Sequence, residues 1–329
     1  MITHAEEITI GEYVAATPAF LNYWPEDETL VAVFLRHGRI VMVIDTDIDQ
    51  DHANAAQSIA RLAWREKVDS ARIIAIAPYS RAGAAIMLAD AITGKLAAYG
   101  VPVEGRAHTT ELRRGGRYTD LDYAEDGIIP DPAATAAMVA AVADGRLILL
   151  GRAAATAQFT ERPEPEADAF IRADIAALRP GHTATVLRDL SRAIAGNDYP
   201  TAELAANAAV LTLYRPARDA MLGLALIDTP AAAAVYTAIG NQLRGRARAH
   251  VLAMAAVLYY IDSQGIASYE ATRAADDADR DDSPPLVKYM QAVHTMAMPV
   301  DYVRPLLAMG QIVATRYGVE VPEYDGRRK

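Results

Sequence analysis

The side chains best suited to hold a metal ion lie in an acidic run over residues 45–52. Asp45, Asp47 and Asp49 occupy alternate positions at the end of an apolar segment. Hard cations prefer clustered carboxylate oxygens, so this spacing fits a site for Mg²⁺ or Ca²⁺. It equally fits a structural role, in which Asp49 or Asp51 caps the following helix and the other carboxylates face water.

A second candidate site is a pocket for a phosphorylated or nucleotide-like ligand. Free backbone N–H groups at a helix start attract anions, and an arginine there can hold a phosphate group. The carboxyl ends of strands are also where open α/β sheets usually bind ligands. The polar residues near such strand ends are Asp45, Asp47, Tyr79, Ser80, Arg81 and Arg117. The alternative interpretation is that Ser80 is an ordinary helix cap and the arginines are solvated.

Two further arginines predict a surface for a protein partner. Arg244 and Arg248 are four residues apart in a helical segment, so they share one face of that helix, and Arg246 and His250 extend the basic patch. Nucleic acid is a poorer partner, because 32 Lys and Arg against 42 Asp and Glu give a net charge of −10. An acidic chain repels phosphate backbones.

Several classes of enzyme are excluded by what the sequence lacks. The chain has no cysteine, which excludes disulfides, cysteine-ligated zinc, iron–sulfur clusters and a thiol nucleophile. It also lacks the H-E-x-x-H and G-x-S-x-G patterns and both glycine-rich nucleotide motifs. Enzymatic activity stays open, and the pattern favours a non-enzymatic interaction or regulatory module over a small-ligand enzyme or sensor.

The elements that must position these residues alternate between strand and helix in the first half. Strands are expected over 30–35, 40–44, 72–77, 102–112, 117–123 and 147–150, and helices over 51–68, over 80–98 and from Pro132. His37-Gly38 between the first two strands predicts a hairpin. This order predicts an α/β domain with one mixed sheet and flanking helices.

The second half has only helical patterns, separated by glycine and proline. The polar, proline-interrupted segment 161–166 marks the expected boundary between an α/β domain over 1–162 and an all-α domain over 163–329. The helices are expected to form a bundle or a loosely tetratricopeptide-like array. Residues 249–278 resemble one such repeat unit, but the period does not recur.

A cytoplasmic location is expected. The longest apolar run, 251–261, is shorter than the roughly 20 residues that a membrane helix needs. The first residues also lack the basic start and apolar core of a secretory signal.

Five stretches along the chain carry a family resemblance. They are 17–31 with its Trp-Pro-Glu turn, Asp45 after the second strand, Gly145-Arg146 with Gly151-Arg152, the helical Tyr214–Asp219, and the acidic, alanine-rich 267–285. Together they resemble an actinobacterial and actinophage family, the domain-of-unknown-function family 4192. Asn22 and Gly151 depart from its usual Gly and Ser, and its common cysteine pair is absent. The resemblance implies the family's architecture and a phage-encoded factor that acts on a host protein. It implies no particular catalytic or binding activity.

Overall fold

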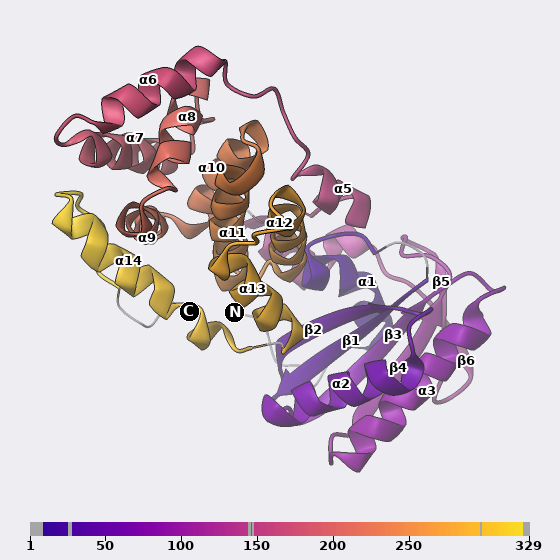
Figure 1. Ribbon diagram of the computed structural model, residues 1–329. Helices are drawn as coiled ribbons and strands as arrows, with labels where there is room; N and C mark the ends of the chain where they lie inside the picture. Colours follow the sequence, from indigo (N-terminus) through magenta and orange to yellow (C-terminus); the bar gives the residue numbers. More distant parts are fainter. Residues whose placement is uncertain (1–8, 26–27, 144–145, 147, 297, 325–329) are drawn as a thin grey trace. The chain divides into compact units, whose positions relative to one another are not determined.

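The computed structural model describes residues 9–25, 28–143, 146, 148–296 and 298–324. These residues fall into two compact units, which divide between Ala154 and Ala155 (Figure 1). The first unit contains a mixed sheet with flanking helices, and the second is a succession of helices. The predicted fold class is therefore confirmed.

The first unit is built on a six-stranded sheet in the order β2-β1-β3-β4-β5-β6. Its strands are β1 (Thr29–Arg36), β2 (Arg39–Asp47), β3 (Ser70–Ile76), β4 (Val103–Thr109), β5 (Arg117–Asp120) and β6 (Glu125–Ile128). The pair β3–β4 is parallel, and the other neighbouring pairs are antiparallel. The predicted hairpin is confirmed, since His37 and Gly38 both have the positive φ that a type I′ turn requires.

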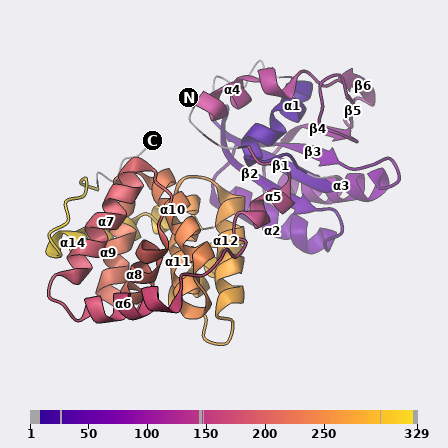
Figure 2. The same cartoon turned by 90° about the horizontal axis from the view of Figure 1, so that it is seen from above.

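Helices cover both faces of this sheet, as Figure 2 shows for α1 and α4 on one side and α2 and α3 on the other. The helices are α1 (Ile10–Leu21), α2 (His52–Arg65), α3 (Ala82–Ala98), the 3₁₀ turn η2 (Pro132–Ala134) and α4 (Ala136–Ala143). Phe34 and Ile73 belong to the core beneath α2 and α3. On the opposite face, the Arg72 guanidinium lies 4.1 Å from the ring centre of Tyr13 in α1.

Three details of the first unit differ from the sequence-based prediction. Helix α1 and strand β6 were not expected. Part of the expected last strand, residue 147, lies outside the described residues, and Leu149 forms a single isolated bridge with Tyr23. Ser80 does not cap α3, because that helix begins one residue later, with Arg81 at the N-cap and no side-chain cap bond.

All the regular elements of the second unit's described residues are helices. Its elements are α5 (Arg152–Ala157), which crosses the boundary, α6 (Ala167–Ala177), α7 (His182–Gly196), α8 (Ala202–Leu211), α9 (Arg215–Gly223), η3 (Leu224–Leu226), α10 (Thr229–Gln242), α11 (Gly245–Ile261), α12 (Gly265–Ala278), α13 (Pro285–Thr295), η4 (Val300–Tyr302) and α14 (Pro305–Arg316). Among the described residues, no helix combines the length and apolarity that crossing a bilayer requires.

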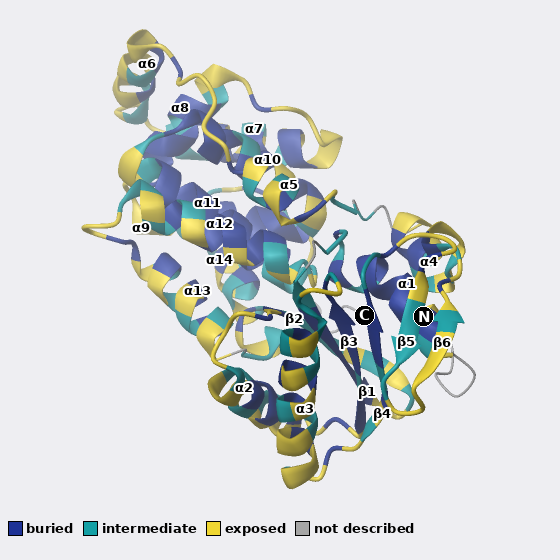
Figure 3. Cartoon of the chain, turned by 90° about the vertical axis from the view of Figure 1, so that its right-hand side faces the viewer, coloured by how far each residue is buried: buried dark blue, intermediate teal, exposed yellow. Residues whose placement is uncertain are grey.

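Helix α11 is the centre of the helical unit. Every residue from Arg248 to Tyr259 is buried, as the dark blue ribbon in Figure 3 shows. A helix that is apolar around its circumference must be enclosed by others, and α11 packs against α10, α12 and α13. Any polar side chain on this helix therefore needs a partner within the protein.

Candidate functional site

Asp45, the first of the predicted ligand residues, is engaged with two neighbouring side chains. The Tyr23 hydroxyl donates a hydrogen bond to Asp45 Oδ2 at 2.6 Å, and Arg152 Nη2 donates to the same oxygen at 3.0 Å. These contacts tie the chain after α1 and the start of α5 to strand β2. The Asp45 carboxylate thus holds three parts of the first unit together.

The rest of the acidic run also has partners within the chain. Asp47 Oδ1 accepts a hydrogen bond from the Asp49 backbone N–H at 2.8 Å, and Asp49 forms an ion pair with Arg81. Asp51 caps α2, as one interpretation of the sequence predicts. Among the described residues, no group of three or more histidine, aspartate or glutamate side chains gathers as a metal site would require.

The structure brings together only part of the predicted phosphate pocket. Tyr79 and Ser80 are exposed beside Arg81, which also lies 3.4 Å from Glu28. Arg117 starts β5, which is four strands from β2 in the sheet order, or roughly 19 Å at the usual strand spacing. Its Nη2 donates instead to Asp126 Oδ2 on β6 at 3.2 Å.

In the helical unit, the two arginines of the predicted partner surface face a short segment of the same chain. We call residues 158–162, which follow α5, the strap. Arg248 is only 4% exposed, so it is not the exposed side chain that the sequence predicts. It lies on the enclosed helix α11, and the strap crosses over its guanidinium. Burial lowers the pKa of Arg248, and the nearby Glu161 carboxylate opposes that shift.

The carbonyls of the strap are bound by side chains of the helices that it crosses. Three carbonyls and the Arg162 N–H bond to α10, α11 and the turn between them, while the N–H groups of Phe159 and Thr160 donate to carbonyls at the end of α5. The hydrogen bonds run from Asn241 Nδ2 to Gln158 O at 2.7 Å, from Arg248 Nη2 to Phe159 O at 2.5 Å, from Arg244 Nη2 to Arg162 O at 2.7 Å, and from Arg162 N to Asn241 O at 2.7 Å.

Two side chains of the strap add specific contacts. Phe159 is 4% exposed and packs edge to face on Tyr259, with 6.0 Å between ring centres. Glu161 lies between the two arginines, 3.0 Å from Arg244 Nε and 3.7 Å from Arg248 Nε. Arg244 is the extended N-cap residue of α11 rather than a residue within that helix, and it binds the strap together with Arg248.

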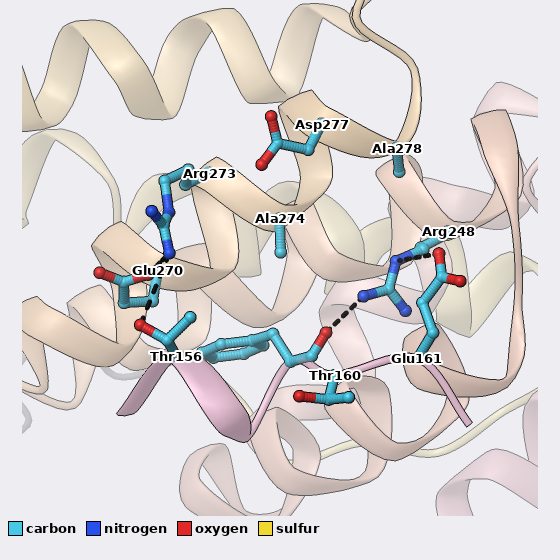
Figure 4. Close-up of a pocket in the computed structure, with 10 residues that line it drawn as sticks. Thr156, Thr160, Glu161, Arg248, Glu270, Arg273, Ala274, Asp277 and Ala278 are labelled. Carbon is cyan, nitrogen blue, oxygen red and sulfur yellow. Dashed lines mark hydrogen bonds and ion pairs between the residues drawn. The ribbon is translucent and has the colours of Figure 1, made fainter. Parts of the chain in front are cut away.

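A pocket of about 290 Å³ lies beside the strap, between residues 156–161 and helices α11 and α12. Figure 4 shows an ion pair at each end, Arg248 with Glu161 and Arg273 with Glu270. The Arg273 Nη2 atom is 2.6 Å from Glu270 Oε2. The lining residues are Thr156, Phe159, Thr160, Glu161, Arg248, Glu270, Arg273, Ala274, Asp277 and Ala278.

The other members of the predicted basic patch are also paired. Arg246 contacts Asp282 and lies 3.8 Å from Asp279, two members of the acidic run after α12. The His250 ring contacts Arg218 Nη1 at 2.9 Å. Burial, and then the charges of Arg218 and Arg246, lower the pKa of His250 to about 4. His250 is therefore uncharged near neutral pH, and the patch has fewer available charges than its sequence suggests.

Sequence reasoning missed three members of this site. Phe159, Glu161 and Asn241 gave no signal on their own, and the strap lay at the edge of a segment interpreted as a linker. One usable signal was the pair Pro163 and Pro165 directly after Glu161-Arg162, since proline favours extended chain that can lie across helices.

Comparison with known proteins identifies a family for the chain. Searches of curated proteins and of solved structures gave no match. A family model described as a domain of unknown function, DUF4192, matches residues 11–283. This range includes the sheet, Asp45, the strap and both Arg244 and Arg248, and it covers more than half of the chain. The chain therefore belongs to the DUF4192 family.

Proposed function

We propose that the chain is a non-enzymatic interaction module whose helical unit binds an extended segment of a partner protein. The observation that carries this proposal is the binding of the strap's main chain by Asn241, Arg244 and Arg248. Donors aimed at backbone carbonyls hold an extended peptide whatever its side chains are, while nearby pockets select particular side chains. If the chain is phage-encoded, as the family resemblance implies, the partner is a host protein.

The charges at the site favour an acidic partner segment. An arginine stays protonated even when burial lowers its pKa, and its planar group suits carboxylates. Arg244 combines a hydrogen bond to the Arg162 carbonyl with an ion pair to Glu161. A partner carboxylate at the place of Glu161 receives the same two cations, Arg244 and Arg248.

A labelled peptide with the sequence of residues 158–166 tests this function by fluorescence anisotropy. We expect saturable binding to the full chain that Arg244→Gln weakens about tenfold, because one hydrogen bond and one ion pair are lost. The matched control is Arg179→Gln, which removes an exposed arginine outside the site and should leave the affinity unchanged. Absence of binding to both the wild-type chain and a chain with a weakened strap contradicts the proposal.

The small-ligand function is the second candidate and has less support. Its residues are Asp45, Asp47, Tyr79, Ser80, Arg81 and Arg117, of which Asp45, Arg81 and Arg117 are paired within the chain. The cluster of Tyr79, Ser80 and Arg81 at a strand end is the observation in its favour. A thermal-shift screen with nucleotides and divalent cations tests it, because a ligand specific for the folded state raises Tm.

A further inference from the structure

We infer that the strap is an internal ligand of this site, which a partner segment with an aromatic residue two positions before an acidic residue displaces. The inference rests on the proposed function and adds the recognition motif and its regulation. It is carried by three features of the strap: how its main chain is held, which of its side chains are anchored, and how easily it can leave.

The strap is bound as a peptide ligand is bound. Residues 160–166 belong to no helix or strand, and the carbonyls of Gln158, Phe159 and Arg162 all accept hydrogen bonds from side chains on α10, α11 and their turn. The strap's N–H groups bond to α5 through two turn bonds, from Phe159 and Thr160 to the carbonyls of Thr156 and Ala157. Pro163 and Pro165 keep the following chain extended. No helix has to unfold when these few hydrogen bonds are exchanged for those of another extended segment.

The recognition motif follows from the two anchored side chains. Phe159 is buried against Tyr259, and Glu161 lies between Arg244 and Arg248. Thr160 between them is exposed, so its identity is free. The site therefore selects an aromatic residue, any residue, and then a carboxylate.

The anchors differ in how firmly they are held. Glu161 is 52% exposed, so water competes for its ion pairs and a carboxylate of a partner can replace it. Phe159 is the firmer anchor because it is almost fully buried. Its removal should therefore open the site without touching either arginine.

Release of the strap has a consequence for the connection between α5 and α6. The strap contributes five residues, which span at most roughly 17 Å when extended. Binding of a partner segment therefore releases residues 158–162 from α10 and α11. The connection between α5 and α6 is then held by fewer contacts whenever a partner occupies the site.

The experiment compares the 158–166 peptide on the wild-type chain and on Phe159→Ala and Glu161→Gln chains. Binding to the Phe159→Ala chain should be about tenfold tighter, because affinity scales with the fraction of molecules whose site is open. Glu161→Gln should give a smaller gain in the same direction. Control peptides with Phe159→Ala or Glu161→Gln should bind more weakly to every chain. A melting curve of each variant establishes that it is folded.

Hydrogen exchange provides a readout independent of affinity. Adding the peptide to the wild-type chain should speed exchange of the Arg162 amide, which is bonded to the Asn241 carbonyl. Equal affinity of wild-type and both strap variants, with unchanged exchange, overturns the internal-ligand inference and leaves the proposed function standing. Failure of the peptide to bind any of the chains defeats both. A wild-type dimer in light scattering that the peptide dissociates would mean that the strap fills a second copy's site, which also overturns the inference.

Discussion

Gly223 of α9 and Gly310 of α14 meet where these two helices cross, and they bring the two backbones into direct contact. A Cβ atom on Gly223 would lie 2.2 Å from the carbonyl carbon of Gly310, and one on Gly310 would lie 2.4 Å from the nitrogen of Gly223. Each position therefore needs a residue without a Cβ atom, because the backbone of the facing glycine cannot move aside as a flexible side chain can.

Gly310→Ala should lower the free energy of unfolding by about 2 kcal/mol, because overpacking costs more than the gain in helix propensity. Chemical denaturation measures the change. The control is Gly94→Ala within α3, where an added Cβ meets no atom within 4 Å and should stabilise the chain by about 0.5–1 kcal/mol. Equal stability of the Gly310→Ala and wild-type chains would mean that the helices separate at little cost.

A second glycine contact lies in the sheet, where Gly127 of β6 pairs with Tyr118 of β5. A Cβ on Gly127 would lie 2.2 Å from Tyr118 Cζ, so the ring covers the glycine. Gly127→Ala should therefore destabilise the protein by about 1–3 kcal/mol. The same substitution in a Tyr118→Ala background should cost much less, because the ring it collides with is gone. If Gly127→Ala lowered the free energy of unfolding equally in the two backgrounds, the Tyr118 ring would not be what the added Cβ atom meets.

Acid should weaken the fold through two histidines. Burial is the main cause that lowers the pKa of both His250 and His294 to about 4, whereas an exposed histidine titrates near 6.5. The unfolded chain therefore binds more protons than the folded chain between pH 6.5 and 4. The contribution of these two histidines to the free energy of unfolding is complete above pH 6.5 and is lost as the pH drops through that range.

Urea denaturation of wild-type and His294→Gln chains from pH 4.5 to 7.5 tests this dependence. His294 lies between the rings of Tyr260 and Tyr269, 5.5 and 5.7 Å away, with Ser268 Oγ at 3.2 Å. The variant should lose less stability than wild type between pH 6.5 and 4.5, because one group that gains a proton on unfolding is missing. Parallel pH profiles would show that His294 has an ordinary pKa.

Arg248 should matter more for stability than its neighbour Arg246. Arg248→Met leaves the Phe159 carbonyl without its side-chain donor, at a cost of about 1–3 kcal/mol for a buried group, while the Gly240 carbonyl keeps the hydrogen bond from the Leu243 N–H. Arg246→Gln removes half-exposed ion pairs and should cost less than about 1 kcal/mol. Thermal melts of the two variants compare these effects. A larger drop in Tm for Arg246→Gln than for Arg248→Met would contradict the assignment of Arg248 as the buried cation.

The architecture was largely predictable because the periodicity is local. The hairpin at His37-Gly38 follows from two apolar runs on either side of a glycine turn. Helices α2 and α3 follow from apolar residues that recur at helical spacing. Helix α1 was missed because its buried positions lie on nearly all sides and because it contains Pro18, a residue that usually ends a helix. Its one sequence signal, the capping box of Thr9 and Glu12, is short.

The candidate site was predictable only in part because its contacts are long-range. The four-residue spacing of Arg244 and Arg248 predicts a shared helix face, whereas Arg244 precedes α11 as its N-cap. Nothing local indicates that both arginines meet Glu161, which precedes Arg244 by more than 80 residues. The same limit applies to Asp49 and Arg81, whose ion pair joins loops after two different strands and closes a cluster that looked available for a ligand.

The crossing of α9 and α14 has a practical consequence for anyone who expresses fragments of this protein. The family match ends at residue 283, yet Val303, Leu307 and Ala314 beyond it belong to the same core as α9 and α11. A fragment trimmed to the matched range would expose apolar surface and the bare backbone at Gly223, and would tend to aggregate. Recombinant boundaries should therefore include α14 and the chain that packs on the core after it, rather than stop at the edge of the family match.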